Sequence, residues 1–313
     1  MKSKMLNMVK PPLKRSYLNN PDRNPFRKIW DSDRFRNPIK YPLADFPLLV
    51  DVEPTNYCNL HCTFCATQIM KRDKGFMDLN LYKQVVDEIA QNSFAIKFSR
   101  WGEPFLHPKI YEMLAYAKEK GLIVHVTTNG TLVDPYKLEN VDSINFSFQG
   151  TTKEEYEIIR GNEFYDLIVN KIETLLQLEN RPATGITTTV LDETEEQVAD
   201  FINKWITKVE QVSWGYTYYE HLNNENAQQF KKRQAWGGRQ LPCNNVLVDL
   251  GVDWDGYVTA CCSDYDCLMA LGSLKDSTIK ELWTCENMQT YRKLILSGQK
   301  DKLQLCRICG NRW

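Results

Sequence analysis

The stretch EPTNYCNLHCTFCATQ, residues 53–68, decides how the rest of the chain is interpreted. It places Cys58, Cys62 and Cys65 in a C-x3-C-x2-C arrangement, and no further cysteine occurs until Cys243. Cysteine thiolates are the usual protein ligands of iron–sulfur clusters. Three of them hold three irons of a [4Fe–4S] cube and leave the fourth iron an open coordination position, which a catalytic metal needs.

A structural zinc ion is the alternative for these three cysteines. His61 lies between two of them and would supply a fourth ligand. Structural zinc sites are closed by four ligands and normally contain C-x2-C pairs. The spacing therefore favours the iron–sulfur cluster.

The composition is that of an ordinary globular protein. Of 313 residues, 42% are hydrophobic and 25% are charged, and the formal net charge is -1. This charge gives no overall attraction to nucleic acid, so no nucleic-acid partner is expected. No run of about 18 apolar residues occurs, so no membrane span is expected. Ten cysteines without an export signal indicate a reducing compartment, which predicts a cytoplasmic protein.

Residues 1–47 form a basic, proline-rich N-terminal extension. They contain eleven Lys or Arg against four Asp, and seven of the thirteen prolines. Prolines at this density interrupt long helices. One interpretation is a solvated or surface-draped arm, and the other is an arm that meets an anionic substrate or partner.

From residue 48 onward, short β-type runs alternate with helical patterns. The expected strands are 48–53, 95–99, 122–128, 143–148, 185–190 and 212–216, and the expected helices are 78–92, 108–121, 151–161 and 195–209. This alternation predicts a parallel sheet with helices outside it. Six units are fewer than the eight of a closed barrel, so residues 48–219 are expected to form an α/β fold, an open partial (β/α)6 barrel. Residues 220–240 are polar and are expected to link the barrel to a second domain at 241–313.

In folds of this kind the chemistry lies at the C-terminal ends of the strands, and the three cysteines directly follow the first expected strand. With Phe64 as the aromatic residue, the motif resembles that of the radical S-adenosylmethionine (SAM) family. The resemblance implies that the open iron binds SAM and that one electron cleaves it to a 5′-deoxyadenosyl radical, which takes a hydrogen atom from the substrate. It also implies an external one-electron donor such as flavodoxin or ferredoxin.

Further motifs follow the next strands and extend the resemblance. The GEP sequence that begins at Gly102 is similar to the family's Gly-Gly-Glu-Pro, and it implies that Gly102 and Glu103 approach the amino group of SAM. Trp101 replaces the first glycine of that motif. The resemblance assigns Thr128 and Asn129 to the ribose and methionine of SAM, although an Asn-Gly pair is also an ordinary turn.

The resemblance continues in the sequences FSFQG (146–150) and IIRG (158–161). Ser147 and Gln149 stand where the family often has S-x-D-G, and Gln149 supplies an amide in place of a carboxylate. Arg160 matches an arginine that often serves the SAM carboxylate, for which a planar guanidinium is suited. An exposed arginine at a helix end is the alternative interpretation of Arg160.

The C-terminal third carries a second cysteine pattern. Cys243 and Cys261 flank an Asp-Gly turn signal, which predicts a β-hairpin that brings the two thiols together. Cys306 and Cys309 add a C-x2-C pair. This pattern resembles the twitch domain, a shortened SPASM domain, and implies one auxiliary [4Fe–4S] cluster with four cysteine ligands. Zinc remains an alternative here because four thiolates suit it.

Three cysteines remain outside these ligand sets. Cys285 lies among helical residues and is interpreted as a buried apolar group. Cys262 and Cys267 lie beside the expected hairpin, where they either pack as spare thiols or face the barrel mouth and donate a hydrogen atom to a substrate radical.

The pattern does not name the substrate, which could be a small molecule or a peptide. Twitch-type relatives include dehydrogenases of cyclitols or sugar alcohols and sugar epimerases. A fully ligated auxiliary cluster accepts an electron more readily than it binds a substrate, which favours oxidation of a polar, carbohydrate-like or cyclitol-like alcohol. A radical epimerase and a peptide-modifying maturase are the enzymatic alternatives, and a zinc-stabilised binding module is the non-enzymatic one.

Overall fold

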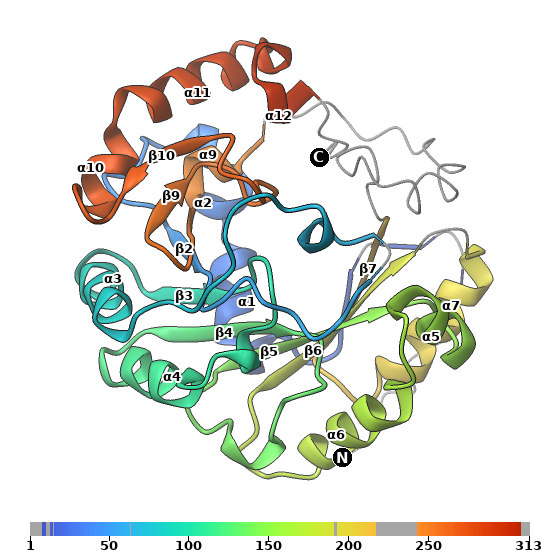
Figure 1. The fold of residues 1–313 in the computed structure, drawn as a ribbon. Coiled ribbons are helices and arrows are strands. Elements are labelled where there is room, and N and C mark those ends of the chain that lie inside the picture. Colours follow the sequence, from blue (N-terminus) through green and yellow to red (C-terminus); the bar gives the residue numbers. More distant parts are fainter. Residues whose placement is uncertain are drawn as a thin grey trace.

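The computed structural model describes residues 8–10, 13–14, 16–62, 64–190, 193–216 and 243–307. Its central feature is one ten-stranded sheet with the strand order β1-β7-β6-β5-β4-β3-β2-β8-β9-β10. Figure 1 shows this sheet curving around the N-terminal helix α1, with most other helices on the outside. No helix in these residues is both long enough and apolar enough to cross a lipid bilayer.

Six parallel strands form the partial barrel, and each lies within two residues of its expected range. They are β2 (Leu49–Val52), β3 (Ala95–Phe98), β4 (Ile123–Thr128), β5 (Ser143–Gln149), β6 (Ala183–Val190) and β7 (Gln211–Tyr216). The expected α/β fold with an open partial barrel is confirmed.

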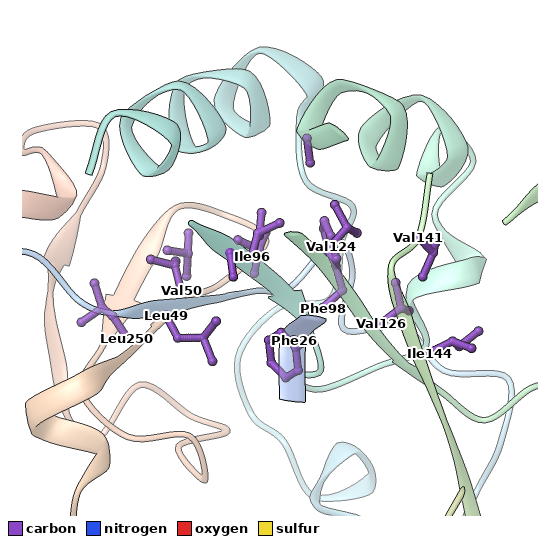
Figure 2. Close-up of a cluster of buried hydrophobic side chains, with 14 of the residues drawn as sticks. Phe26, Leu49, Val50, Ile96, Phe98, Val124, Val126, Val141, Ile144 and Leu250 are labelled. Atoms are coloured by element: carbon purple, nitrogen blue, oxygen red, sulfur yellow. The ribbon is translucent and has the colours of Figure 1, made fainter. Parts of the chain in front are cut away.

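Amphipathic helices cover the convex face of the barrel strands. They are α3 (Leu79–Asn92), α4 (Ile110–Glu119), α5 (Lys153–Arg160), α6 (Tyr165–Leu176) and α7 (Glu195–Trp205). Figure 2 shows Val50, Ile96 and Val124 on the side of the strands that faces the helices. Sequence analysis did not identify α6, although its buried Ile168, Ile172 and Leu175 have helical spacing.

The described part of the N-terminal extension is built into the barrel, which differs from its interpretation as a solvated or surface-draped arm. Its contact with an anionic substrate or partner stays a prediction. Strand β1 (Ser16–Leu18) pairs antiparallel with β7. Helix α1 (Pro25–Trp30) lies on the concave face, where the Phe26 ring stacks on His125 with a centroid separation of 4.1 Å. Helix α2 (Asp33–Arg36) follows it. The physical reason is that an open barrel leaves its interior uncovered, and aromatic residues between the prolines fill that space.

The C-terminal region continues the barrel sheet. Strand β8 (Asp249–Val252) pairs in parallel with β2, and β9 (Tyr257–Thr259) and β10 (Ala270–Ser273) extend the sheet antiparallel. The helices around them are α9 (Asn245–Val248), α10 (Ile279–Thr284), α11 (Glu286–Leu296) and α12 (Gln304–Arg307). The expected β8–β9 hairpin is confirmed, and Gly256 adopts the positive φ of 87° that its turn requires. The linker expected at 220–240 lies outside the described residues.

Short 3-10 helices complete the described structure. They occur at Pro21–Arg23, Pro38–Lys40, Ala66–Gln68, Pro104–Leu106, Pro135–Lys137 and Lys300–Lys302.

Candidate active site

Three cysteines lie in the loop that follows β2, and a hydrogen-bond donor faces the sulfur of each. The backbone N–H of Leu60 donates to Cys58 Sγ at 3.5 Å, and Thr67 Oγ1 donates to Cys65 Sγ at 3.2 Å. Arg160 Nη1 lies 3.4 Å from Cys62 Sγ and donates to it. Donors of this kind stabilise sulfur that carries negative charge, as ligating thiolates do.

Burial disfavours the ionised form of two of these thiols, Cys58 and Cys65, so their thiolates need a nearby positive charge. Burial, together with the charges of Glu103, Cys62 and Cys65, raises the pKa of Cys58 to about 12. Burial also raises the pKa of Cys65. Closely spaced thiols of high pKa ionise together only when a metal supplies positive charge. The donor set therefore fits a metal cluster.

Glu103 joins the loop after β3 to the loop after β4. Its side chain is 1% exposed, and it accepts hydrogen bonds from Thr128 Oγ1 at 2.7 Å and from the Asn129 N–H at 2.7 Å. It also caps the 3-10 helix at Pro104–Leu106 through the Phe105 N–H. Burial raises the pKa of Glu103 despite these donors. The carboxylate thus organises the two loops that the sequence motifs assigned to SAM.

The neighbouring residues of these loops are equally constrained. Gly102 has a φ of 84°, and an added Cβ would lie 2.2 Å from the Thr55 carbonyl oxygen. Asn129 Nδ2 donates to Asn59 Oδ1 at 2.9 Å and lies 3.8 Å from Cys58 Sγ. The structure therefore brings the GEP and TTNGT motifs against the cysteine loop.

Arg160 is buried, which differs from its interpretation as an exposed arginine at a helix end. It is the last residue of α5 and is 5% exposed. One guanidinium nitrogen donates to Cys62, and another donates to the Ser147 carbonyl oxygen. This arginine thus connects β5 to the cysteine loop.

Two buried polar atoms, one of Gln149 and one of Arg160, have no protein partner among the described residues. Gln149 Nε2 donates to Thr189 Oγ1 at 3.2 Å, but Gln149 Oε1 accepts no hydrogen bond. Arg160 Nε is also without an acceptor. Unpaired buried polar atoms are costly unless a ligand or water completes them. They fit a polar, charged ligand such as SAM at this end of the barrel.

Phe64 contributes to a small apolar cluster at the barrel rim. Ala66 and Ile159 are buried there, and Phe64, Ile69, Trp101 and Tyr265 pack against them. Trp101 Nε1 donates to the Asp264 carbonyl oxygen at 3.0 Å, and its ring meets Tyr265 edge-on. The residue that replaces the usual glycine therefore contacts the C-terminal region.

Three of the four predicted auxiliary ligands lie in the described part of the C-terminal region. Cys243 precedes α9, Cys261 follows β9, and Cys306 lies on α12. A hydrogen bond with Cys262, burial and the charge of Cys243 raise the pKa of Cys261. The hairpin therefore places Cys243 and Cys261 within electrostatic reach of each other. Cys309 lies outside the described residues.

The remaining cysteines occupy distinct environments. Cys267 Sγ donates to Asp253 Oδ2 at 3.1 Å. Cys262 lines a small cavity with Asp51, Arg100 and Asp249. Cys285 is half-buried at the junction of α10 and α11. These contacts do not show either Cys262 or Cys267 as a thiol that is open to the barrel mouth. Their role as hydrogen-atom donors stays a prediction.

Four charged side chains that are buried beside the cysteine loop were not predicted from the sequence. They are Glu53, Arg72, Arg100 and Asp253. Their positions could have identified three of them from the sequence. Glu53, Arg100 and Asp253 each come just after an apolar strand, where catalytic loops begin.

Comparison with protein families identifies the two regions. Residues 52–204 match the radical SAM superfamily, and residues 243–310 match the SPASM family, described as an iron–sulfur cluster-binding domain. The chain therefore belongs to the radical SAM superfamily and carries a C-terminal SPASM-type domain. Its cofactors are accordingly SAM, a SAM-binding [4Fe–4S] cluster and an auxiliary iron–sulfur cluster.

Three curated relatives cover different shares of the chain. The tungsten-containing aldehyde ferredoxin oxidoreductase cofactor-modifying protein of Pyrococcus furiosus is 26% identical over 48% of this chain and 45% of its own length. The mycofactocin maturase MftC of Mycobacterium tuberculosis is 29% identical over 42% of this chain and 35% of its own length. The chain thus matches less than half of either protein. The S-adenosyl-L-methionine-dependent 2-deoxy-scyllo-inosamine dehydrogenase of Niallia circulans is 23% identical over 84% of this chain and 92% of its own length.

Two solved structures share the fold. BtrN in complex with AdoMet and 2-DOIA has a TM-score of 0.57 and 17% identity, covering 87% of this chain and 98% of that one. Streptococcus suis SuiB bound to its precursor peptide SuiA has a TM-score of 0.60 and 14% identity, covering 82% of this chain and 69% of that one. At these identities the likeness is one of fold.

Proposed function

We propose that this radical SAM enzyme oxidises a polar alcohol of the cyclitol or carbohydrate class. The observation that carries the proposal is the match to the 2-deoxy-scyllo-inosamine dehydrogenase, which extends over 84% of this chain and 92% of the relative. The match therefore includes the barrel and reaches into the auxiliary region. The other two relatives match over less than half of their lengths.

The residues divide into two ligand sets and one set of organising contacts. Cys58, Cys62 and Cys65 would hold the SAM cluster, and Cys243, Cys261, Cys306 and Cys309 would hold the auxiliary cluster. When bound, SAM and the first cluster supply a radical that removes a hydrogen atom from the substrate. Arg160 donates to Cys62, and Glu103 holds the loops after β3 and β4 in one arrangement.

Electron counting supports the need for a second metal centre. Conversion of an alcohol to a ketone removes two protons and two electrons from the substrate. Hydrogen abstraction removes one of each, so one proton and one electron still have to leave. The second thiolate set provides this chain with a place for an electron-accepting group.

A peptide-modifying reaction is the second candidate, because a maturase matches 42% of this chain at 29% identity. The test is anaerobic incubation with SAM, dithionite and 2-deoxy-scyllo-inosamine in deuterium oxide. We expect one ketone and one 5′-deoxyadenosine per turnover, with no deuterium at the reacting carbon. Turnover of a peptide but of no cyclitol or sugar alcohol would overturn the proposal.

Deuterium separates oxidation from epimerisation in the same experiment. An epimerase returns a hydrogen atom from a thiol that exchanges with solvent, so deuterium would appear at an inverted carbon. Loss of that deuterium in Cys262→Ala or Cys267→Ala would assign the donor and replace oxidation by epimerisation.

A further inference from the structure

Four charged side chains connect the two cysteine-bearing loops of this chain. We call Glu53, Arg72, Arg100 and Asp253 the charged bridge. The side chains of Glu53, Arg100 and Asp253 are 0% exposed, and that of Arg72 is 10% exposed. Charged groups are almost never buried so completely unless they are paired.

Arg72 ties the cysteine loop of the barrel to the loop that follows β9. Its guanidinium binds both carboxylate oxygens of Glu53, at 2.7 and 2.5 Å, and its Nη1 lies 3.6 Å from Asp253. Its Nε donates to the Tyr265 carbonyl oxygen at 2.8 Å. The backbone N–H of Lys71 donates to Asp266 Oδ1 at 2.7 Å, and that of Arg72 donates at 3.2 Å.

Arg100 makes the corresponding connection from the loop after β3. Its Nε and Nη2 bind Asp253 Oδ1 at 2.9 and 2.6 Å, and Nη2 also donates to the Asp264 carbonyl oxygen at 3.2 Å. Gly251 makes room for this side chain, because an added Cβ would lie 2.1 Å from Arg100 Nη1. Trp101 donates to the same carbonyl oxygen of Asp264.

The loop held in this way begins at Cys261, an auxiliary ligand. Inside it, the Asp264 carboxylate accepts hydrogen bonds from the Leu268 N–H at 2.9 Å and the Met269 N–H at 2.7 Å. Cys267 has a positive φ of 58° and donates its thiol proton to Asp253. The charged bridge and the residues next to it therefore form hydrogen bonds with both the backbone and the side chains of residues 261–269.

Stability alone does not account for this arrangement. Burying ions costs free energy that their mutual attraction barely offsets, and apolar replacements are often as stable. What a buried ion pair provides is a preferred geometry, because an arrangement that separates the two charges leaves both unpaired.

We propose that the charged bridge, with Trp101, consists of positioning residues that fix the loop of Cys261 relative to the loop of Cys58, Cys62 and Cys65. The bridge would thereby set the separation of the two clusters. The consequence for catalysis rests on the proposed function, because only a reaction that uses both clusters depends on their separation.

The test compares Asp253→Asn and Trp101→Phe with the wild type by hydrogen–deuterium exchange, on the reconstituted holoenzyme and again on the full chain without iron. We expect the amides of Leu268 and Met269 to exchange about tenfold faster in both variants, because each loses a hydrogen bond that holds the loop. Exchange in α3 should be unchanged. Glu173→Gln, which breaks an exposed ion pair with Lys208, is the matched control.

Trp101→Phe retains an aromatic ring and loses one hydrogen bond. It therefore tests the role of the charged bridge on its own if Asp253→Asn does not fold. Electron paramagnetic resonance of the dithionite-reduced holoenzyme should show an altered spin–spin interaction at unchanged iron content. Wild-type exchange and an unaltered spectrum in the variants would overturn the proposal. The exchange measurement needs neither clusters nor substrate, so failure of the proposed function would be seen separately as absent turnover.

Discussion

Arg160 shows that a functional residue can be identified from the sequence while its environment, exposed or buried, is not. Its position at the end of an amphipathic helix is compatible with a solvated helix end, yet the structure buries it between Ser147 and Cys62. Gly161, with a φ of 66°, ends the helix directly after it. The environment of Glu103 was also not predicted from the sequence. Its carboxylate accepts hydrogen bonds from Thr128 and Asn129 in the loop after β4.

At the residue scale, Arg160→Gln should slow reductive SAM cleavage by about 10- to 100-fold, as is typical when a partner of a metal ligand is lost. The reason is that Cys62 loses a charged hydrogen-bond donor. Formation of 5′-deoxyadenosine under dithionite measures the effect. Lys153→Gln is the control, since Lys153 lies on the same helix and pairs with Asp166 at the surface. Equal rates for both variants would contradict the assigned contact.

At the scale of elements, helix α1 shows how the open barrel is filled. Phe26 stacks on His125, and the Lys97 ammonium lies 5.6 Å from the centroid of Trp30. Burial and the positive charge of Lys97 lower the pKa of His125 from 6.5 to about 3. The concave face is therefore built to hold a neutral imidazole.

This histidine predicts the pH dependence of stability. Because the folded pKa lies below the unfolded one, the unfolded chain takes up the proton first. The contribution of His125 is complete above pH 6.5 and is lost as the pH falls toward 3. The free energy of unfolding then falls by up to about 1.4 kcal/mol for each unit by which the pH is lowered. Urea unfolding between about pH 5 and about pH 7.5, a range that covers the upper part of this transition, should show that stability depends less on pH in His125→Asn than in the wild type. A His125→Asn variant whose stability depends on pH as strongly as that of the wild type would contradict this prediction.

Strand β8 joins the C-terminal region to the barrel. A substitution at Gly251 tests how tightly this strand packs against Arg100. Gly251→Ala should lower the free energy of unfolding by about 1–3 kcal/mol, because the new Cβ displaces Arg100. Gly215→Ala in β7 is the control, since no atom of the described residues lies within 4 Å of its added Cβ. Chemical denaturation measures both. A Gly251→Ala variant as stable as Gly215→Ala would show that Arg100 has room to move.

At the scale of the whole molecule, the chain is expected to hold two clusters whose ligands come from opposite ends of the sequence. The triple variant Cys58→Ala, Cys62→Ala, Cys65→Ala should lose SAM cleavage and retain about four of about eight irons per chain. Iron and zinc analysis after anaerobic reconstitution measures this. Iron near zero with stoichiometric zinc in the triple variant would identify the C-terminal site as structural zinc.

Much of this architecture follows from sequence because it rests on local patterns. Alternating apolar runs and amphipathic helices predict the six strands, and four of the helices outside them. An Asp-Gly pair predicts the β8–β9 hairpin. The spacing of Cys58, Cys62 and Cys65 predicts the SAM-cluster chemistry, because ligand type and open coordination can be inferred from neighbouring residues.

Contacts between residues distant in sequence were decided by the tertiary structure alone. The N-terminal aromatic residues fill the barrel because its concave face would otherwise lie open, and no local pattern in residues 1–47 indicates this. The pairing of β8 with β2 brings Asp253 to Arg100, 153 positions away. Buried charges such as Glu53 and Arg72 look like surface residues in the sequence. Only the fold, by excluding water and requiring each charge to find a partner, makes them a bridge between the two cysteine-bearing loops.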